Sequence, residues 1–235
     1  MSINPFSRNF ILVPVLLNVL ILFYNFIPDI GVVIILLTVL IRVLLAPSFH
    51  KSLKSQSAMT ALQPKLNELR EKHKDDKQAQ ATAMMALYKE HKISPFSSCL
   101  PMLIQLPILI SLYFVFTQAL NGDLNGLYSF VKRPENLSPM FLGLLDLSKP
   151  SHILAILAGL TQFWQSKLMA PKNTGNSQDS TQKMMSMQMT YVLPIVSVVI
   201  AWNFPAGLPL YWVVTTLFGI GQQYFIMRKQ QAPSA

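Results

Sequence analysis

The 235-residue sequence contains a single cysteine, Cys99, so the chain cannot close an internal disulfide or build a cysteine-based metal cluster. Its four histidines are scattered and lack the spacing of a metal site. The sequence also has no motif of a zinc protease, an α/β-hydrolase or a phosphate-binding loop. These absences argue against an enzyme, and we expect no metal and no cofactor.

Charge is equally scarce, at 12% of residues against about 25% in soluble domains. Hydrophobic residues make up 51% and the mean hydropathy is +0.39, which places the chain among membrane proteins. The net charge of +9 is compatible with nucleic-acid binding, but no nucleic-acid motif accompanies it. Basic residues that gather on the cytoplasmic side of a membrane protein are the better explanation.

Five apolar segments approach the roughly 20 residues that a helix needs to cross a bilayer. Lipid offers no partner for an unpaired backbone, so each is predicted to be helical and the fold to be an all-α integral membrane protein. The predicted spans are residues 30–48, 96–119, 151–169, 187–203 and 208–227. The remaining segments are 1–29 as an external flank, 49–95 as a cytoplasmic loop, 120–150 as an external loop, 170–186 as a cytoplasmic loop, 204–207 as an external turn and 228–235 as a tail.

A sixth apolar stretch, residues 10–27, is long enough to span but has two interpretations. Pro14, Asn18 and Asn25 fall near one helical face, which suits a helix lying in the membrane interface. A spanning helix would need a very tight turn at Pro28 before the next span. The interfacial interpretation is favoured.

Orientation follows from the distribution of the 19 lysines and arginines. Most lie in residues 49–95, in 167–183 and in the tail, which are predicted to face the cytoplasm. The opposite side has only Arg8, Lys132, Arg133 and Lys149. With five spans, the N-terminus is then external and the C-terminus cytoplasmic.

The polar segment 49–95 is predicted to form two antiparallel helices outside the membrane, although a solvated charged spacer is the simpler alternative. Leucines at 62, 66 and 69 form a helical stripe, and Asp75-Asp76-Lys77 reads as the turn. Methionines offer adaptable apolar contacts, so this hairpin is a candidate docking surface. The candidate docking residues are Met59, Leu62, Leu66, Leu69, Met84, Met85 and Tyr88.

Arg42 lies inside the first predicted span, where an arginine at the helix centre costs about 2.5–3.5 kcal/mol on insertion scales. No predicted span contains an acidic residue, so the side chain has no evident counter-ion from its own chain. One interpretation is that it snorkels to lipid headgroups. The other is a polar cavity open to the cytoplasm, lined by polar residues of several spans. The candidate lining residues are Arg42, Gln105, Thr38, Thr161, Gln162, Ser197 and Thr215.

Several stretches together resemble the YidC family of membrane protein insertases, which has mitochondrial and chloroplast relatives. They are GVVII at 31–35 followed by Thr38, Arg42 and Pro47; LQPK at 62–65; DDK at 75–77; MMALYK at 84–89; PMLIQLP at 101–107; FPAGLPLYW at 204–212; and GIGQQ at 219–223. The resemblance implies five spans around a hydrophilic groove that is closed outside and open to the cytoplasm and to lipid. It also implies that Arg42 and Gln105 line the groove, that residues 49–91 form the cytoplasmic hairpin needed for insertion, and that residues 10–27 form an interfacial helix.

Some features differ from the family pattern. No large external domain precedes the first span, no lipoprotein cysteine lies near the N-terminus, and the tail has only Arg228 and Lys229 as basic residues. The expected partners are nascent membrane proteins and the lipid bilayer, with the ribosome, the signal recognition pathway and the Sec translocon as further candidates and no specific nucleic acid. The expected location is the bacterial plasma membrane. A small anion transporter and a non-inserting assembly scaffold are the alternative functions.

Overall fold

The computed structural model describes residues 10–94, 100–169 and 187–231. Helix accounts for most of this part of the chain, and a two-stranded hairpin is added on one loop. The elements are α1 (Leu12–Phe26), α2 (Ile30–Ala61), α3 (Gln63–Lys72), α4 (Lys77–Glu90), α5 (Leu100–Leu120), β1 (Met140–Phe141), β2 (Leu145–Asp146), α6 (His152–Met169), η2 (Gln188–Val192), α8 (Leu193–Trp202) and α9 (Gly207–Gln231).

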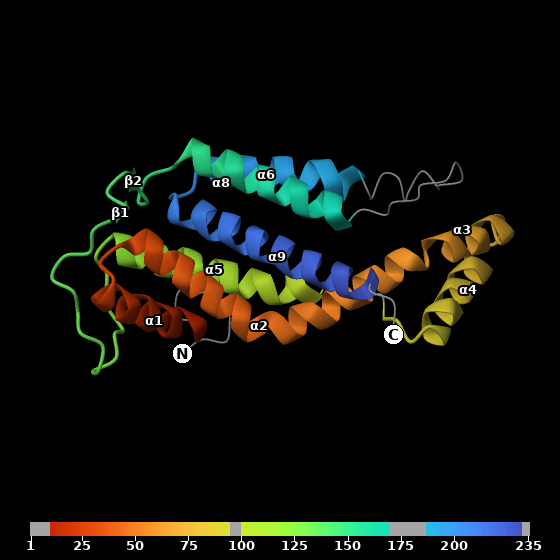
Figure 1. Ribbon diagram of the computed structural model, residues 1–235, viewed down its shortest axis with the longest axis horizontal. Helices are drawn as coiled ribbons and strands as arrows, with labels where there is room; N and C mark the ends of the chain where they lie inside the picture. Colours follow the sequence, from red (N-terminus) through yellow and green to blue (C-terminus); the bar gives the residue numbers. More distant parts are fainter. Residues whose placement is uncertain (1–9, 95–99, 170–186, 232–235) are drawn as a thin grey trace.

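The long helices run side by side along the long axis of the molecule (Figure 1). Helix α9 packs against both α2 and α6, α6 packs against α8, and α1 packs against α5. The pair α3–α4 lies at one end, and the hairpin β1–β2 with the loop before it lies at the other. The helix pair α3–α4 and the hairpin β1–β2 are therefore separated by the full length of the helical bundle.

Helix α2 is longer than the predicted first span, which was expected to end at residue 48. It continues through Pro47 to Ala61 without a break and has 32 residues, or about 48 Å at 1.5 Å per residue. A proline inside a helix removes one backbone hydrogen bond and crowds the preceding turn, so packing must hold the helix together here; Phe49 and Ser52, just beyond Pro47, are both buried. The helix thus exceeds the roughly 30 Å of a hydrocarbon core and extends toward α3 and α4.

Helices α3 and α4 form the two-helix hairpin expected from the sequence. Leu66 of α3 is fully buried. The Asp76 carboxylate accepts hydrogen bonds from the backbone N–H groups of Gln78 and Ala79 at the start of α4. Such a cap satisfies donors that the first helical turn leaves free. The predicted turn at residues 75–77 therefore also defines where α4 begins.

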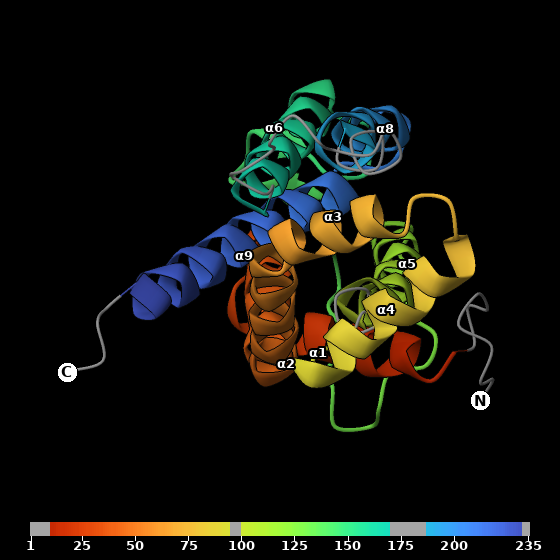
Figure 2. The same ribbon diagram turned by 90° about the vertical axis from the view of Figure 1, so that its right-hand side faces the viewer.

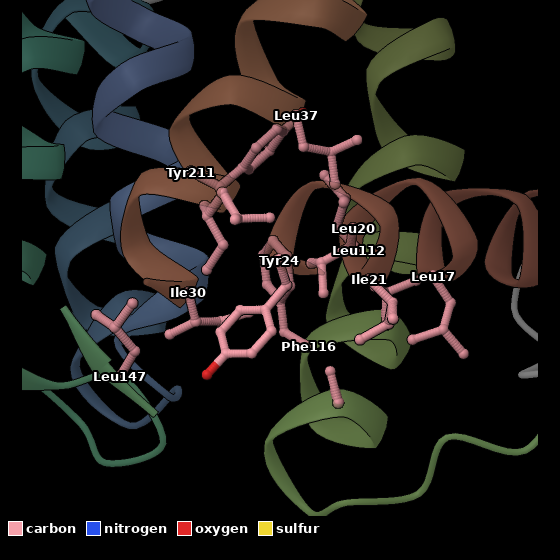
Figure 3. Packing of buried hydrophobic residues seen from close by; sticks show 14 of the residues in the cluster. Leu17, Leu20, Ile21, Tyr24, Ile30, Leu37, Leu112, Phe116, Leu147 and Tyr211 are labelled. Carbon is pink, nitrogen blue, oxygen red and sulfur yellow. The ribbon is translucent and has the colours of Figure 1, made fainter. Parts of the chain in front are cut away.

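A buried apolar cluster joins α1, α2, α5 and the start of α9 (Figure 3). Leu17, Ile21 and Leu112 are fully buried there, and Tyr24 and Tyr211 lie in the same cluster. Large apolar side chains elsewhere remain exposed on the outer surfaces of α6 and α8, among them Ile153, Ile195 and Val199. Such a surface suits a lipid environment better than water.

Within the described residues, two helical stretches could cross a membrane by length and composition alone, Ile30–Ala61 and Leu103–Leu120. Helix α1 and the stretch Thr190–Trp202 are apolar but shorter. At 15 residues, α1 is about 22 Å long, which is short for a 30 Å hydrocarbon core.

The polar residues of α1 bind the loop at 121–139 rather than forming a free polar face. The Asn18 amide donates to the Gly126 carbonyl at 3.1 Å and accepts from the Tyr128 N–H at 2.7 Å. Asn25 donates to the Lys132 carbonyl at 2.8 Å, and the Tyr24 hydroxyl accepts from Ser138 at 2.9 Å. The asparagines that suggested an interfacial helix therefore have a specific structural partner.

Replacing Asn18 with alanine should loosen this loop. Asn18 is only 3% exposed, so its loss leaves a loop carbonyl and a loop N–H without their partner, at a cost of about 1–3 kcal/mol. We expect faster hydrogen exchange at the Tyr128 amide and a lower unfolding temperature. Asn25→Ala removes a single exposed hydrogen bond and should have a smaller effect on both measurements. Equal effects of the two substitutions would contradict this assignment.

Candidate functional site around Arg42

Arg42 is the charged side chain that the fold buries most deeply among the described residues, at 8% exposure. Its guanidinium carbon lies 4.5 Å from the centre of the Phe49 ring. Phe49 follows two turns later on the same face of α2, so helix geometry alone brings the pair together. One turn before Arg42, the Thr38 hydroxyl donates to the carbonyl of Ile34 at 2.6 Å and is also buried.

Tyr211 of α9 connects Arg42 to the other helices. Its side chain is 2% exposed, its hydroxyl accepts a hydrogen bond from the Gln105 amide of α5, and the charge of Arg42 acts on it electrostatically. Thr215, which is 6% exposed, follows one turn later on α9. The structure therefore brings together Arg42, Gln105 and Thr215 of the predicted set, and adds Tyr211 at the junction of α2, α5 and α9.

Among the described residues, no acidic side chain forms an ion pair with Arg42. An arginine cannot discharge the cost of burial by losing its proton, so the favourable partners are a ring face, hydroxyl and amide groups, water or an incoming anion. The site therefore has an uncompensated positive charge held beside neutral polar groups. Such a charge is suited to binding polar or acidic groups.

Three other predicted lining residues have different partners. Thr161 of α6 accepts a hydrogen bond from the Thr216 hydroxyl at 2.8 Å, and Gln162 accepts one from the Trp212 indole at 3.2 Å. Both bonds join α6 to the face of α9 that carries Trp212 and Thr216, away from Tyr211. Ser197 of α8 is buried and donates to the Leu193 carbonyl of its own helix at 2.9 Å. Thr161 and Gln162 thus connect two helices, and Ser197 bonds within its own helix. Polar residues inside membranes often make such contacts.

The predicted docking residues of the hairpin also divide into groups. Leu62, which lies between α2 and α3, and Leu66 of α3 are both buried. Met85 is 46% exposed and is the best placed for contact with a partner. The half-buried members are Met59, Leu69, Met84 and Tyr88.

Sequence reasoning did not assign Tyr211 or Phe49 to the site. Tyr211 is part of the FPAGLPLYW stretch at 204–212, but an aromatic residue in an apolar helix is ordinarily a packing residue. Phe49 could have been found from its spacing, because seven residues from Arg42 is two helical turns. The expected end of the helix at residue 48 concealed that relation.

Comparison with known proteins identifies the family. Residues 22–233 match the family described as 60Kd inner membrane protein. A protein from Fusobacterium nucleatum named membrane protein insertase YidC is 37% identical over 205 residues, which cover 87% of this chain and 89% of that protein. The chain belongs to the YidC family. The sequence resemblance is thereby confirmed, and membership places the chain among inner-membrane proteins of bacteria.

Other relatives in the YidC family are longer. Proteins named membrane protein insertase YidC from Syntrophus aciditrophicus and Geobacter sulfurreducens are 40% and 39% identical and cover 92% and 91% of this chain. The chain spans only 36% of the length of each. A solved structure, described as an active YidC insertase crystal structure with the first transmembrane domain resolved, is 25% identical with a TM-score of 0.58. It covers 86% of this chain and 43% of that chain, which confirms a mainly helical YidC-type fold.

Proposed function

We propose that this chain inserts hydrophobic segments of newly made proteins into the bilayer and helps them fold and assemble. The observation that carries the proposal is the buried Arg42, set beside Gln105 and Tyr211 without an acidic partner among the described residues. The YidC relatives, which are named insertases, support the same activity. No bond is made or broken in such a reaction, so the chain acts as an insertase and chaperone rather than as an enzyme.

In this proposal the chain spans the membrane five times, through α2, α5, α6, η2 with α8, and α9. The hairpin α3–α4 and the C-terminus face the cytoplasm, because the basic residues gather on that side. The N-terminus and the loop at 120–150 face outward, and α1 lies in the external interface. A hydrophilic groove runs from the cytoplasm to Arg42, with Gln105, Tyr211 and Thr215 on its wall and Thr38 behind the arginine.

The proposed mechanism lowers the cost of moving a polar flank into the membrane. A hydrophobic segment is captured at the hairpin, where Met85 is exposed. Its polar flank enters the groove, and Arg42 and Gln105 replace part of the hydration that acidic or polar groups lose. The apolar segment then leaves sideways into lipid, driven by about 0.8 kcal/mol for each buried CH₂. Roughly 20 apolar residues supply enough free energy for this without a nucleotide.

The proposed partners follow from this mechanism. Nascent membrane proteins are the substrates and the lipid bilayer receives them. The exposed residues of the hairpin would be the contact surface for the ribosome, the signal recognition pathway or the Sec translocon.

Reconstituted insertion tests the function directly. The purified chain is placed in liposomes, a short single-span protein with an acidic external tail is synthesised in their presence, and protease protection of the tail is measured. We expect protection above that of protein-free liposomes of the same lipid. Protection no greater than in empty liposomes, across several such substrates, would contradict insertase activity and leave a scaffold or a transporter as the alternative.

A further inference from the structure

A cleft opens between α2 and α9 on the hairpin side of Arg42. Its volume is 470 Å³, and it is lined by Ala46 and His50 of α2 and by Phe218, Gly221, Gln222 and Phe225 of α9. The two α2 residues are one turn apart, and the α9 residues occupy successive turns, so two helix faces border the cleft. Figure 2 shows the end of α9 extending out of the bundle past α2. Among the described residues that line the cleft, none belongs to α5, where Gln105 lies.

The cleft changes from apolar to basic along α2. His50 lies 21 residues beyond the cap residue Asp29, or about 31 Å along the helix, close to the thickness of a hydrocarbon core. Ala46 and Phe218 therefore lie at the depth of acyl chains, and His50 lies at the depth of headgroups. Lys54, one turn beyond His50 on the same face of α2, is exposed.

Two features of α9 show that the cleft suits a ligand. The side-chain oxygen of Gln222 is buried and has no hydrogen-bond partner among the described residues, so it needs a donor. A Cβ atom built on Gly221 would meet no atom within 4 Å, whereas one on Gly219 would lie 2.3 Å from the Gln165 side chain. Gly219 thus allows close packing of α6, but Gly221 leaves a bare helix surface that faces open space.

We propose that this cleft binds one anionic phospholipid from the leaflet on the side of the hairpin α3–α4. One acyl chain lies along Phe218, Gly221 and Phe225, and the phosphate lies near His50 and Lys54. An imidazole and an ammonium group can both donate to a phosphate, and a headgroup hydroxyl can donate to the Gln222 oxygen. The small volume favours a flexible chain over a helix, which is about 10–12 Å across with its side chains.

Native mass spectrometry of the detergent-purified full chain tests this site. The probes are phosphatidylglycerol, phosphatidylcholine with the same acyl chains, and inorganic phosphate. We expect one phosphatidylglycerol to be retained in preference to the other two. Gly221→Leu should fill the cleft and lower the retained fraction about tenfold, which corresponds to 1.4 kcal/mol. The double substitution His50→Ala with Lys54→Ala should remove the preference for phosphatidylglycerol over phosphatidylcholine.

Leu217→Phe is the matched control, because it adds bulk to an exposed position of α9 outside the cleft lining. This variant should retain phosphatidylglycerol as the wild type does. Thermal unfolding of each variant checks that the bundle is intact. Because Gly221 lies on α9 and His50 and Lys54 lie on α2, the two tests of the cleft are independent. Undiminished retention in both Gly221→Leu and the His50/Lys54 variant would overturn the proposal. The proposal would also be overturned if a photo-crosslinker at Phe225 formed crosslinks only to a second copy of the chain or to another polypeptide, and none to lipid.

Discussion

Replacing Arg42 with alanine should reduce the insertion of a single-span substrate with an acidic external tail by about tenfold. The substitution removes the charge that offsets the dehydration of the tail, and a factor of ten corresponds to only 1.4 kcal/mol. Gln105 and Tyr211 would remain hydrogen-bonded to each other, so the wall of the site would persist without its charge. Protease protection of the tail in liposomes, at matched protein content, measures the effect.

The charge and the shape of Arg42 can be separated by two further variants. Arg42→Lys keeps a positive charge and should retain much of the insertion, although lysine cannot reproduce the planar contact with the Phe49 ring. Lys149→Ala, at an exposed site beside β2, is a control for the loss of any basic residue. A substrate with a neutral tail should be less affected by Arg42→Ala. If the acidic tail is inserted equally well by Arg42→Ala and by the wild type, the charge has no role in the mechanism.

Gly159→Val should separate α6 from α8 and lower the free energy of unfolding by about 1–3 kcal/mol, the usual cost of overpacking. A Cβ atom on Gly159 would lie 2.2 Å from a methyl group of Val198 and 3.3 Å from the Pro194 carbonyl oxygen. The side chain can turn away, but the backbone carbonyl cannot do so without moving α8. Thermal unfolding in detergent, followed by tryptophan fluorescence, gives the change in stability, because His152 stacks on Trp202 in the same helix pair.

Leu160→Val is the control, since it places the same residue one position further along α6, at a site that is 58% exposed. Valine favours helix more than glycine but less than leucine, so helix propensity alone would make Leu160→Val the less stable variant. A lower unfolding temperature of Gly159→Val than of Leu160→Val therefore reports the contact with α8. Equal unfolding temperatures for the two variants would show that α6 and α8 are not held at the distance described.

The helical fold could be predicted because long uncharged segments leave no alternative in lipid, and because caps and turns are local signals. Asp76 marks the start of α4 in the sequence as clearly as in the structure. The length of α2 was not predictable in this way. Pro47 and the change to polar residues suggested an end, yet tertiary packing of Phe49 and Ser52, which are both buried, continues the helix.

The candidate site was predictable only in part. Arg42 was identified because a charge within an apolar span is costly wherever it points. The sequence could not separate the polar residues that lie beside Arg42 from those that join other helices, since composition does not reveal which helix face meets which neighbour. Thr161 and Gln162 lie on α6 and bind α9 at Thr216 and Trp212, whereas Gln105 on α5 binds a different face of α9 at Tyr211. To make this distinction, one must know how α5, α6 and α9 are each rotated about their own axes.

The unbroken α2 has a mechanical consequence. Its first turn is anchored, because the Asp29 carboxylate caps the helix at Val32 and also accepts from the Leu142 N–H of the β-hairpin loop at 2.6 Å. From this pivot, Arg42 is about 20 Å away and Ala61 about 48 Å away along one continuous helix. A sideways displacement of 5 Å at the hairpin end, about one helical pitch, would therefore move the level of Arg42 by about 2 Å. A load applied to the hairpin α3–α4 would therefore reach the buried charge at reduced amplitude and increased force.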